Sequence, residues 1–119
     1  MKVLVVDDEA DIRDSLREFL EDEGYSVASA SNGAEALGVL GERDLPGVVI
    51  LDLAMPKMSG SELYSRMQCD PRLCNVPVLV STSNPSLVPR GVPALKKPVD
   101  LDRLLTYVQE HDAARAPPS

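Results

Sequence analysis

The chain has 119 residues, enough for one domain with a single hydrophobic core, and its hydrophobic and charged fractions of 44% and 26% are ordinary for a globular protein. The formal net charge of −7 argues against nucleic acid as a direct partner, because contacts to phosphates need clustered Lys and Arg side chains. No apolar run approaches the length of a membrane span, and two cysteines without a signal peptide favour free thiols in a reducing compartment. We therefore expect a cytoplasmic domain that binds neither nucleic acid nor membrane.

The first half of the chain alternates apolar runs with segments of helical periodicity. Lys2–Val6 is a continuous, mostly β-branched run, which is typical of a strand buried on both faces. Between residues 9 and 23 apolar side chains recur at helical spacing and Gly24 follows as a stop signal, so this segment is predicted to be a helix. The elements predicted next are a short strand, a modest helix and a fully apolar strand, at Ser26–Ala30, Ala34–Leu40 and Val48–Leu51.

The second half of the chain continues the same alternation. The pattern predicts a helix over Ser61–Gln68, a buried strand over Val76–Ser81 and a short last strand over Ala94–Lys96. Asp100 is expected to cap a final helix whose apolar side chains share one face. We interpret residues 1–112 as the folded domain, and residues 113–119 as a flexible tail or the start of a linker.

This alternation of strands and helices predicts the fold class. Parallel strands joined by right-handed helical crossovers form a sheet with helices on both faces. We therefore expect an α/β domain with a doubly wound, five-stranded parallel sheet. In such sheets ligands bind outside the carboxyl ends of the strands, so the residues directly after each apolar run are the candidates for function.

Polar or charged side chains follow four of the predicted strands. They are Asp7 and Asp8 after the first strand, Asp52 after the third, Thr82 after the fourth and Lys97 after the fifth. Neighbouring carboxylates repel one another, and a hard divalent cation with oxygen ligands relieves that repulsion, which indicates Mg2+. Taken singly, each residue has a simpler explanation as a helix cap, a turn residue, a strand-end hydroxyl or a solvated cation. Their joint occurrence at one edge of the sheet favours a functional site.

Several motifs resemble those of the receiver domains of two-component response regulators, chemotaxis regulators among them. The stretch LVVDDE at Leu4–Glu9 is similar to the family's acidic-pair motif, and LDLAMPKMSG at Leu51–Gly60 is similar to its phosphoacceptor loop. The resemblance extends over essentially the whole chain, with further matches in GYSVASASNGAEAL at Gly24–Leu37, in VLVST ending at Thr82, and in Lys97–Pro98. It implies the flavodoxin-like strand order 2-1-3-4-5.

The resemblance implies a role in a phosphorelay. Asp52 would be the nucleophile that accepts a phosphoryl group from a histidine kinase or a phosphotransfer protein, forming an aspartyl phosphate. The implied ligands of Mg2+ are the carboxylates of Asp8 (directly), Asp7 (directly or through water) and Asp52, and the backbone carbonyl of Ala54. The ion would neutralise charge during the transfer.

The same resemblance gives roles to the other two residues at the strand ends. Lys97 would help to neutralise charge, and the Thr82 hydroxyl would bind a phosphoryl oxygen. Movement of Thr82 would switch a protein–protein interaction surface that a downstream target or an output domain reads. The chain would promote only its own Mg2+-dependent phosphorylation and dephosphorylation, and we do not expect an enzyme acting on other substrates.

The connection between Thr82 and the last strand departs from the family's pattern. It has only about ten residues (SNPSLVPRGV), fewer than a parallel crossover usually needs, and Pro85 and Pro89 forbid a regular helix. We predict that the fourth crossover helix is absent or reduced to a turn. Ala94 also stands where the family usually places a switch aromatic, so the usual coupling between the hydroxyl and that ring cannot operate.

A missing helix is expected to uncover apolar surface on the sheet near Val78, Val80 and Leu95. Large exposed apolar patches usually mark interfaces. We therefore expect this shortened-crossover face to pack against a partner or a second copy of the chain, as in a homodimer.

Two alternative functions remain open on the sequence alone. The altered crossover and Ala94 favour an interaction module that has kept the fold and works without phosphorylation, whereas the complete set of polar strand-end residues opposes it. The other alternative is an Mg2+-dependent phosphatase with an aspartyl nucleophile. Such enzymes carry the pattern D-x-D after the first strand, but here Asp7 and Asp8 are adjacent.

Overall fold

The computed structural model describes residues 2–53, 59–84, 86 and 88–112. Its centre is a five-stranded sheet in the order β2-β1-β3-β4-β5, and every neighbouring pair is parallel. The strands are β1 (Lys2–Val6), β2 (Ser26–Ala30), β3 (Val48–Asp52), β4 (Val78–Thr82) and β5 (Ala94–Lys96). The doubly wound α/β fold and the strand order 2-1-3-4-5 are therefore confirmed.

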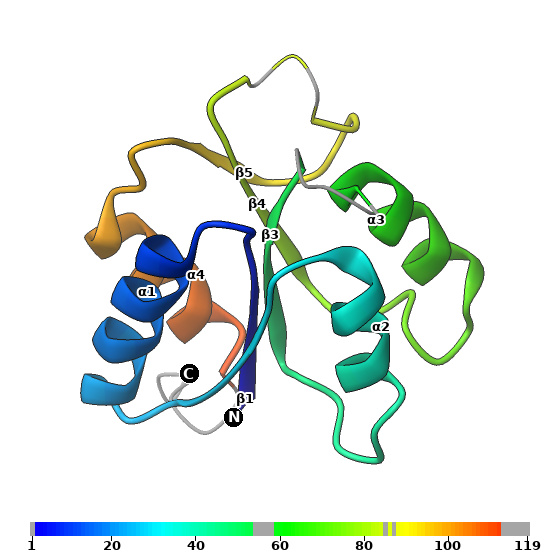
Figure 1. The fold of residues 1–119 in the computed structure, drawn as a ribbon, viewed down its shortest axis with the longest axis horizontal. Coiled ribbons are helices and arrows are strands. Elements are labelled where there is room, and N and C mark those ends of the chain that lie inside the picture. The colour runs from blue at the N-terminus through cyan, green and yellow to red at the C-terminus, as the bar shows by residue number, and fades with distance from the viewer. Residues whose placement is uncertain (1, 54–58, 85, 87, 113–119) are drawn as a thin grey trace.

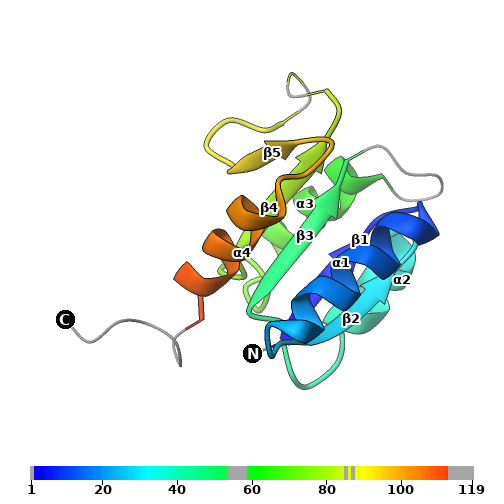
Figure 2. The ribbon, with the colours of Figure 1, turned by 90° about the vertical axis from the view of Figure 1, so that its left-hand side faces the viewer.

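Helices cover both faces of the sheet. They are α1 (Ala10–Asp22), α2 (Gly33–Leu40), α3 (Gly60–Cys69) and α4 (Leu101–Glu110). Figure 1 shows α1 and α4 on one side of the strands and α2 and α3 on the other, and Figure 2 looks onto the face that α1 and α4 cover. None of the helices among the described residues is long and apolar enough to cross a membrane.

The two faces of the sheet have separate hydrophobic cores. Alternate side chains of a strand point to opposite faces, so a continuous apolar run supplies both cores at once. In β1, Val3 and Val5 pack with α1 and α4, whereas Leu4 and Val6 pack toward α2 and α3. The strands β1, β3 and β4 are almost completely buried for this reason.

Local capping explains where several helices begin and end. The Asn32 side chain accepts a hydrogen bond from the Glu35 amide at 2.9 Å, and the Glu35 carboxylate in turn accepts one from the Ser31 amide at 2.7 Å. The Asp100 carboxylate caps α4 as predicted, by accepting hydrogen bonds from the next turn of the backbone. After α1 the chain turns at Gly24, whose φ of 94° is a left-handed conformation that favours glycine.

Strand β4 begins two residues later than its apolar pattern predicts. The prediction started at Val76, but the Val76 amide donates to the Leu73 carbonyl in the turn that follows α3. Pro77 has no amide hydrogen to donate, and its carbonyl accepts from Val49 as the first contact with β3. The ladder of β4 therefore starts at Val78.

The crossover from β4 to β5 contains no α-helix among its described residues, as predicted (Figure 1). The expected apolar surface is nevertheless not found among the described residues, and that prediction was wrong. Val80 is fully buried and Val78 is 6% exposed, because Val88 and Val92 of the crossover pack against the core beneath α2 and α3. Two valines in an irregular segment thus cover the sheet where a helix would otherwise lie.

Leu95 does not share a face with Val78 and Val80. The register pairs Val80 with Ala94, so Leu95 points to the opposite face, where it packs beside α1 and α4. In the described part of the chain, the one large hydrophobic side chain that is exposed is Leu101, at 39%. The described residues therefore do not form the apolar patch on which we based a homodimer at this face.

Candidate functional site

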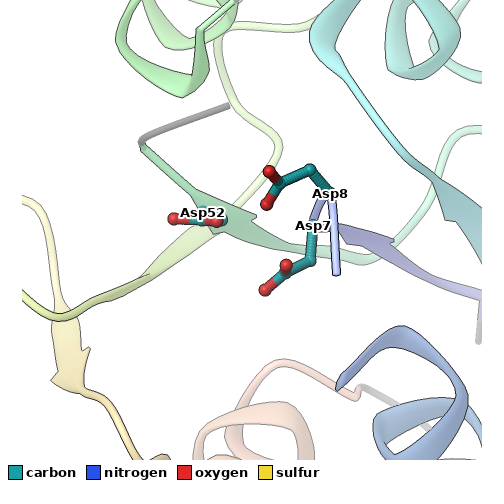
Figure 3. Close-up of side chains that lie close together, drawn as sticks. All are labelled: Asp7, Asp8 and Asp52. Atoms are coloured by element: carbon teal, nitrogen blue, oxygen red, sulfur yellow. The ribbon is translucent and has the colours of Figure 1, made fainter. Parts of the chain in front are cut away.

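Three carboxylates meet at the carboxyl ends of β1 and β3 (Figure 3). The two strands are neighbours, and Val6 pairs with Leu51, so the residues that follow, Asp7 and Asp52, lie at the same edge of the sheet. One oxygen atom from each of Asp7, Asp8 and Asp52 lies within 4.8 Å of the others. Asp7 and Asp52 are only 3% and 5% exposed, whereas Asp8 is exposed to solvent. The sheet thus brings together the three acids that the sequence singled out.

Lys97 reaches this cluster from the edge strand. Its Nζ lies 3.1 Å from Asp7 Oδ2 and 3.3 Å from Asp52 Oδ2, and its backbone amide donates to the Thr82 carbonyl at 2.9 Å. Burial lowers the pKa of the Lys97 ammonium, but the hydrogen bond and charge of Asp7, followed by those of Asp52, outweigh that effect and raise the pKa above its usual value. Lys97 is therefore positively charged throughout the neutral range.

The two members of the acidic pair differ in their partners. Asp7 Oδ1 accepts a hydrogen bond from the Glu9 amide at 2.9 Å, and Asp7 Oδ2 accepts one from Lys97. Among the described residues, no hydrogen bond or ion pair engages the carboxylate of Asp8. One carboxylate oxygen of Asp7 is thus occupied by Lys97, and Asp8 is the carboxylate most available to a cation.

Thr82 also lies at this edge, at the end of β4. It is 3% exposed, and its hydroxyl accepts a hydrogen bond from the Asn84 amide at 3.1 Å and donates one to the Asn84 carbonyl at 3.3 Å. The hydroxyl is therefore engaged by its own turn. Ala54, whose carbonyl is the remaining predicted ligand, lies outside the described residues.

The chemistry of the cluster fits a hard divalent cation. Its ligands are oxygen atoms, and three negative carboxylates against one ammonium leave two negative charges to be balanced. Asp8 and Asp52, with Asp7 beside them, are the side chains that would hold such an ion. A small number of carboxylate oxygens, with the exposed side chain of Asp8 next to solvent, suits Mg2+, which usually retains several water ligands.

The structure adds one residue to the site, Arg13, and a physical reason for another, Gly60. Arg13 of α1 donates from Nη1 to the backbone carbonyl of Asp7 at 2.7 Å. No sequence pattern predicts this contact. Gly60 begins α3 directly against β3, and a Cβ atom built there would lie 2.1 Å from the Asp52 carbonyl oxygen. Gly60 belongs to the motif noted above, but the reason for a glycine becomes visible only in three dimensions.

Replacing Lys97 with Met is expected to lower the free energy of unfolding by about 2 kcal/mol in the presence of EDTA, because Asp7 and Asp52 lose their buried counter-charge. Added Mg2+ should restore much of this loss by binding the folded state. Urea unfolding with and without Mg2+ measures both effects. Lys96→Met, at the exposed neighbouring position, is the matched control and should change stability by less than about 0.5 kcal/mol. Equal losses in the two variants would contradict the assigned role of Lys97.

Comparison with known proteins identifies the family. Residues 3–109 match the family model described as the response regulator receiver domain. An uncharacterised 14.6 kDa protein of Leptolyngbya boryana is 40% identical, with 98% of this chain and 94% of that protein covered. The response regulator MprA of Mycobacterium leprae is 36% identical over 92% of this chain, but this chain spans only about half (50%) of MprA.

A solved structure agrees with the sequence relatives. The response regulator TrrA of Thermotoga maritima, determined in complex with Mg(2+)-BeF, is 29% identical, with 93% of this chain and 98% of TrrA covered and a TM-score of 0.82. The family match over nearly the whole chain, the shared fold and the acidic cluster at the carboxyl edge of the sheet all agree. The chain belongs to the response regulator receiver domain family.

Proposed function

We propose that the chain is the phosphoacceptor of a two-component phosphorelay, and that Asp52 receives a phosphoryl group from a phosphohistidine of a histidine kinase or a phosphotransfer protein. The observation that carries the proposal is the setting of Asp52, a nearly buried carboxylate with an ammonium at 3.3 Å and two further carboxylates beside it. A carboxylate in such a setting can act as a nucleophile while its surroundings neutralise the incoming phosphate.

Apart from Ala54, the residues used in the proposed transfer have the positions described above. A carboxylate oxygen of Asp52 attacks phosphorus, the phosphorus–nitrogen bond of the phosphohistidine breaks, and the imidazole leaves with the electron pair. Lys97 is placed to neutralise charge that arrives on Asp52. When bound by Asp8 and Asp52, with Asp7 directly or through water and the Ala54 carbonyl, Mg2+ supplies the remaining charge neutralisation. The Mg(2+)-BeF complex of TrrA supports this metal assignment.

We propose that Thr82 links phosphorylation to a change in the conformation of the crossover surface. To bind a phosphoryl oxygen, its hydroxyl must give up one or both of its hydrogen bonds to Asn84. Asn84 is in turn tied to Ser86, whose amide and hydroxyl both donate to Asn84 Oδ1. Since Ala94 replaces the usual aromatic residue, we propose that the crossover carries the signal, through Asn84, to a downstream target or an output domain.

The proposed setting is the cytoplasm, where the kinase or phosphotransfer protein would be the phosphoryl donor. The chain would catalyse no reaction on other substrates beyond its own phosphorylation and dephosphorylation. Relatives such as MprA extend well beyond the region matched here. We therefore propose only the kind of molecule that receives the signal, which is a protein partner or an attached domain.

The test is the intact mass of the chain after incubation with acetyl phosphate, in Mg2+ and in EDTA. We expect a single phosphoryl adduct in Mg2+ and none in EDTA. Without a cation, the negative charges of the acidic cluster repel the negatively charged phosphoryl donor. A parallel titration with beryllium fluoride and Mg2+, the combination bound by TrrA, removes any dependence on the donor. Absence of both the adduct and Mg2+-dependent beryllium fluoride binding would contradict the proposal.

A phosphorylation-independent interaction module is the second candidate. It is favoured by a crossover that has no α-helix among its described residues, and by the engagement of Thr82 with its own turn. This candidate predicts that partner binding is the same for the wild type and for Asp52→Asn, whereas the phosphorelay predicts that only the wild type responds to the phosphoryl donor.

A further inference from the structure

The backbone of Asp7 is held at both ends. Its amide donates to the Ala30 carbonyl at 3.1 Å, which extends the pairing of β1 with β2, and its carbonyl accepts from Arg13 Nη1 at 2.7 Å. Arg13 is half-buried, and its own amide donates to Glu9 within the first turn of α1. Its side chain extends back toward the start of the helix, as helical side chains generally do.

The carbonyl that Arg13 binds belongs to the peptide group joining Asp7 to Asp8. A peptide group is planar, so the direction of this carbonyl fixes where the Cα atom of Asp8 lies. The side chain of Asp7 has the Glu9 amide and Lys97 to hold it, but the described residues offer no such partner to the Asp8 carboxylate. The position of Asp8 consequently depends on its backbone.

We infer that Arg13 is a positioning residue, which holds the Asp7–Asp8 peptide so that the Asp8 carboxylate faces Asp52 across the cation site. This inference rests on the proposed function of the site. The positive charge of Arg13 by itself opposes the binding of a cation nearby, so charge alone gives no reason for an arginine here. Partners that orient metal ligands commonly change metal affinity by about 10-fold or more.

Arg17 offers a matched control on the same helix. It lies four residues farther along α1 and donates from Nη2 to the Val27 carbonyl at 3.2 Å, so it makes the same kind of bond to a strand backbone. Arg17 makes no contact with the acidic pair in the described part of the chain; its other partner is Glu21, at 4.0 Å. Substitution of Arg17 removes a similar hydrogen bond and the same charge without touching Asp7 or Asp8.

The experiment measures the dissociation constant of Mg2+ alone by isothermal titration calorimetry, for the wild-type chain and for Arg13→Met, Arg13→Lys and Arg17→Met. We expect Arg13→Met to weaken Mg2+ binding by about tenfold, although loss of a positive charge would by itself tighten it. Arg13→Lys, which retains a donor, should recover most of the affinity. Arg17→Met should bind Mg2+ at least as tightly as the wild type. Urea unfolding of each variant reports stability separately, and Arg13→Gln takes the place of Arg13→Met if the latter does not fold.

The inference is overturned if Arg13→Met binds Mg2+ as tightly as the wild type or more tightly, if Arg17→Met weakens binding equally, or if Arg13→Lys recovers none of the affinity. A wild-type chain that does not bind Mg2+ also overturns it. A wild-type chain that binds Mg2+ but forms neither the phosphoryl adduct nor the beryllium fluoride complex would contradict the proposed function alone, and the comparison of arginine variants would still decide the role of Arg13.

Discussion

Asp52→Asn is expected to abolish the phosphoryl adduct while the domain stays folded. The amide has nearly the size and shape of the carboxylate but is not a competent nucleophile, so the covalent step cannot take place. Lys97 loses one partner but retains Asp7 at 3.1 Å. The substitution also removes one negative charge from a cluster of carboxylates that repel one another. We therefore expect the free energy of unfolding to change by no more than about 1 kcal/mol. Intact mass after treatment with acetyl phosphate and Mg2+ measures the adduct, and urea unfolding measures stability.

Two further variants distinguish the effect of losing the nucleophile from the effect of losing another carboxylate. Asp14→Asn removes an exposed acid from α1 and should form the adduct like the wild type. Asp8→Asn keeps the nucleophile but removes the carboxylate most available to a cation, so its adduct should form more slowly and need more Mg2+. A phosphoryl group that appears undiminished in Asp52→Asn, on any residue, would refute the assignment of Asp52.

Gly60→Ala is expected to destabilise the domain by about 3 kcal/mol or more, since the new methyl group has no space. A Cβ atom at Gly60 would lie 2.1 Å from the carbonyl oxygen of Asp52 and 2.6 Å from the Cα atom of Leu53. Both contacts are with backbone, which cannot rotate away as a flexible side chain could. The Gly60 amide also donates to the Leu53 carbonyl at 2.9 Å and so keeps α3 close to the end of β3. Any relief of the clash must move the backbone of Asp52, so the rate of phosphorylation should fall as well.

Gly38→Ala is the matched control, with the opposite expected sign. Gly38 lies inside α2, and an added Cβ atom would have no neighbour within 4 Å among the described residues, so an alanine there meets no obstacle. Alanine in a helix interior is more stable than glycine by about 0.5–1 kcal/mol. Urea unfolding of the two variants compares them directly, and losses of similar size would show that crowding at Gly60 is not the cause.

The fold and most of the site could be predicted from the sequence because both depend on local patterns. Continuous apolar runs identify strands buried on both faces, and their alternation with helical segments requires parallel pairing. Parallel strands end at the same edge of the sheet, so residues directly after the runs had to lie together. Asp7, Asp8, Asp52 and Lys97 do so.

The tertiary structure alone decided which atoms touch. The sequence placed Lys97 at the edge, but its contacts with Asp7 and Asp52 depend on a side chain that reaches past β4, which no periodicity reveals. The bond from Arg13 to the Asp7 carbonyl likewise depends on how α1 sits against β1.

In the shortened crossover, too, the local backbone could be predicted from the sequence but the packing could not. Its length and prolines were sufficient to predict that a helix is missing, because proline forbids helical hydrogen bonds locally. What covers the sheet instead depends on the path of an irregular segment, and here that path brings Val88 and Val92 onto the core around Val78 and Val80. Backbone preference is local and can be read from the chain, whereas burial depends on residues that are brought together only when the domain packs.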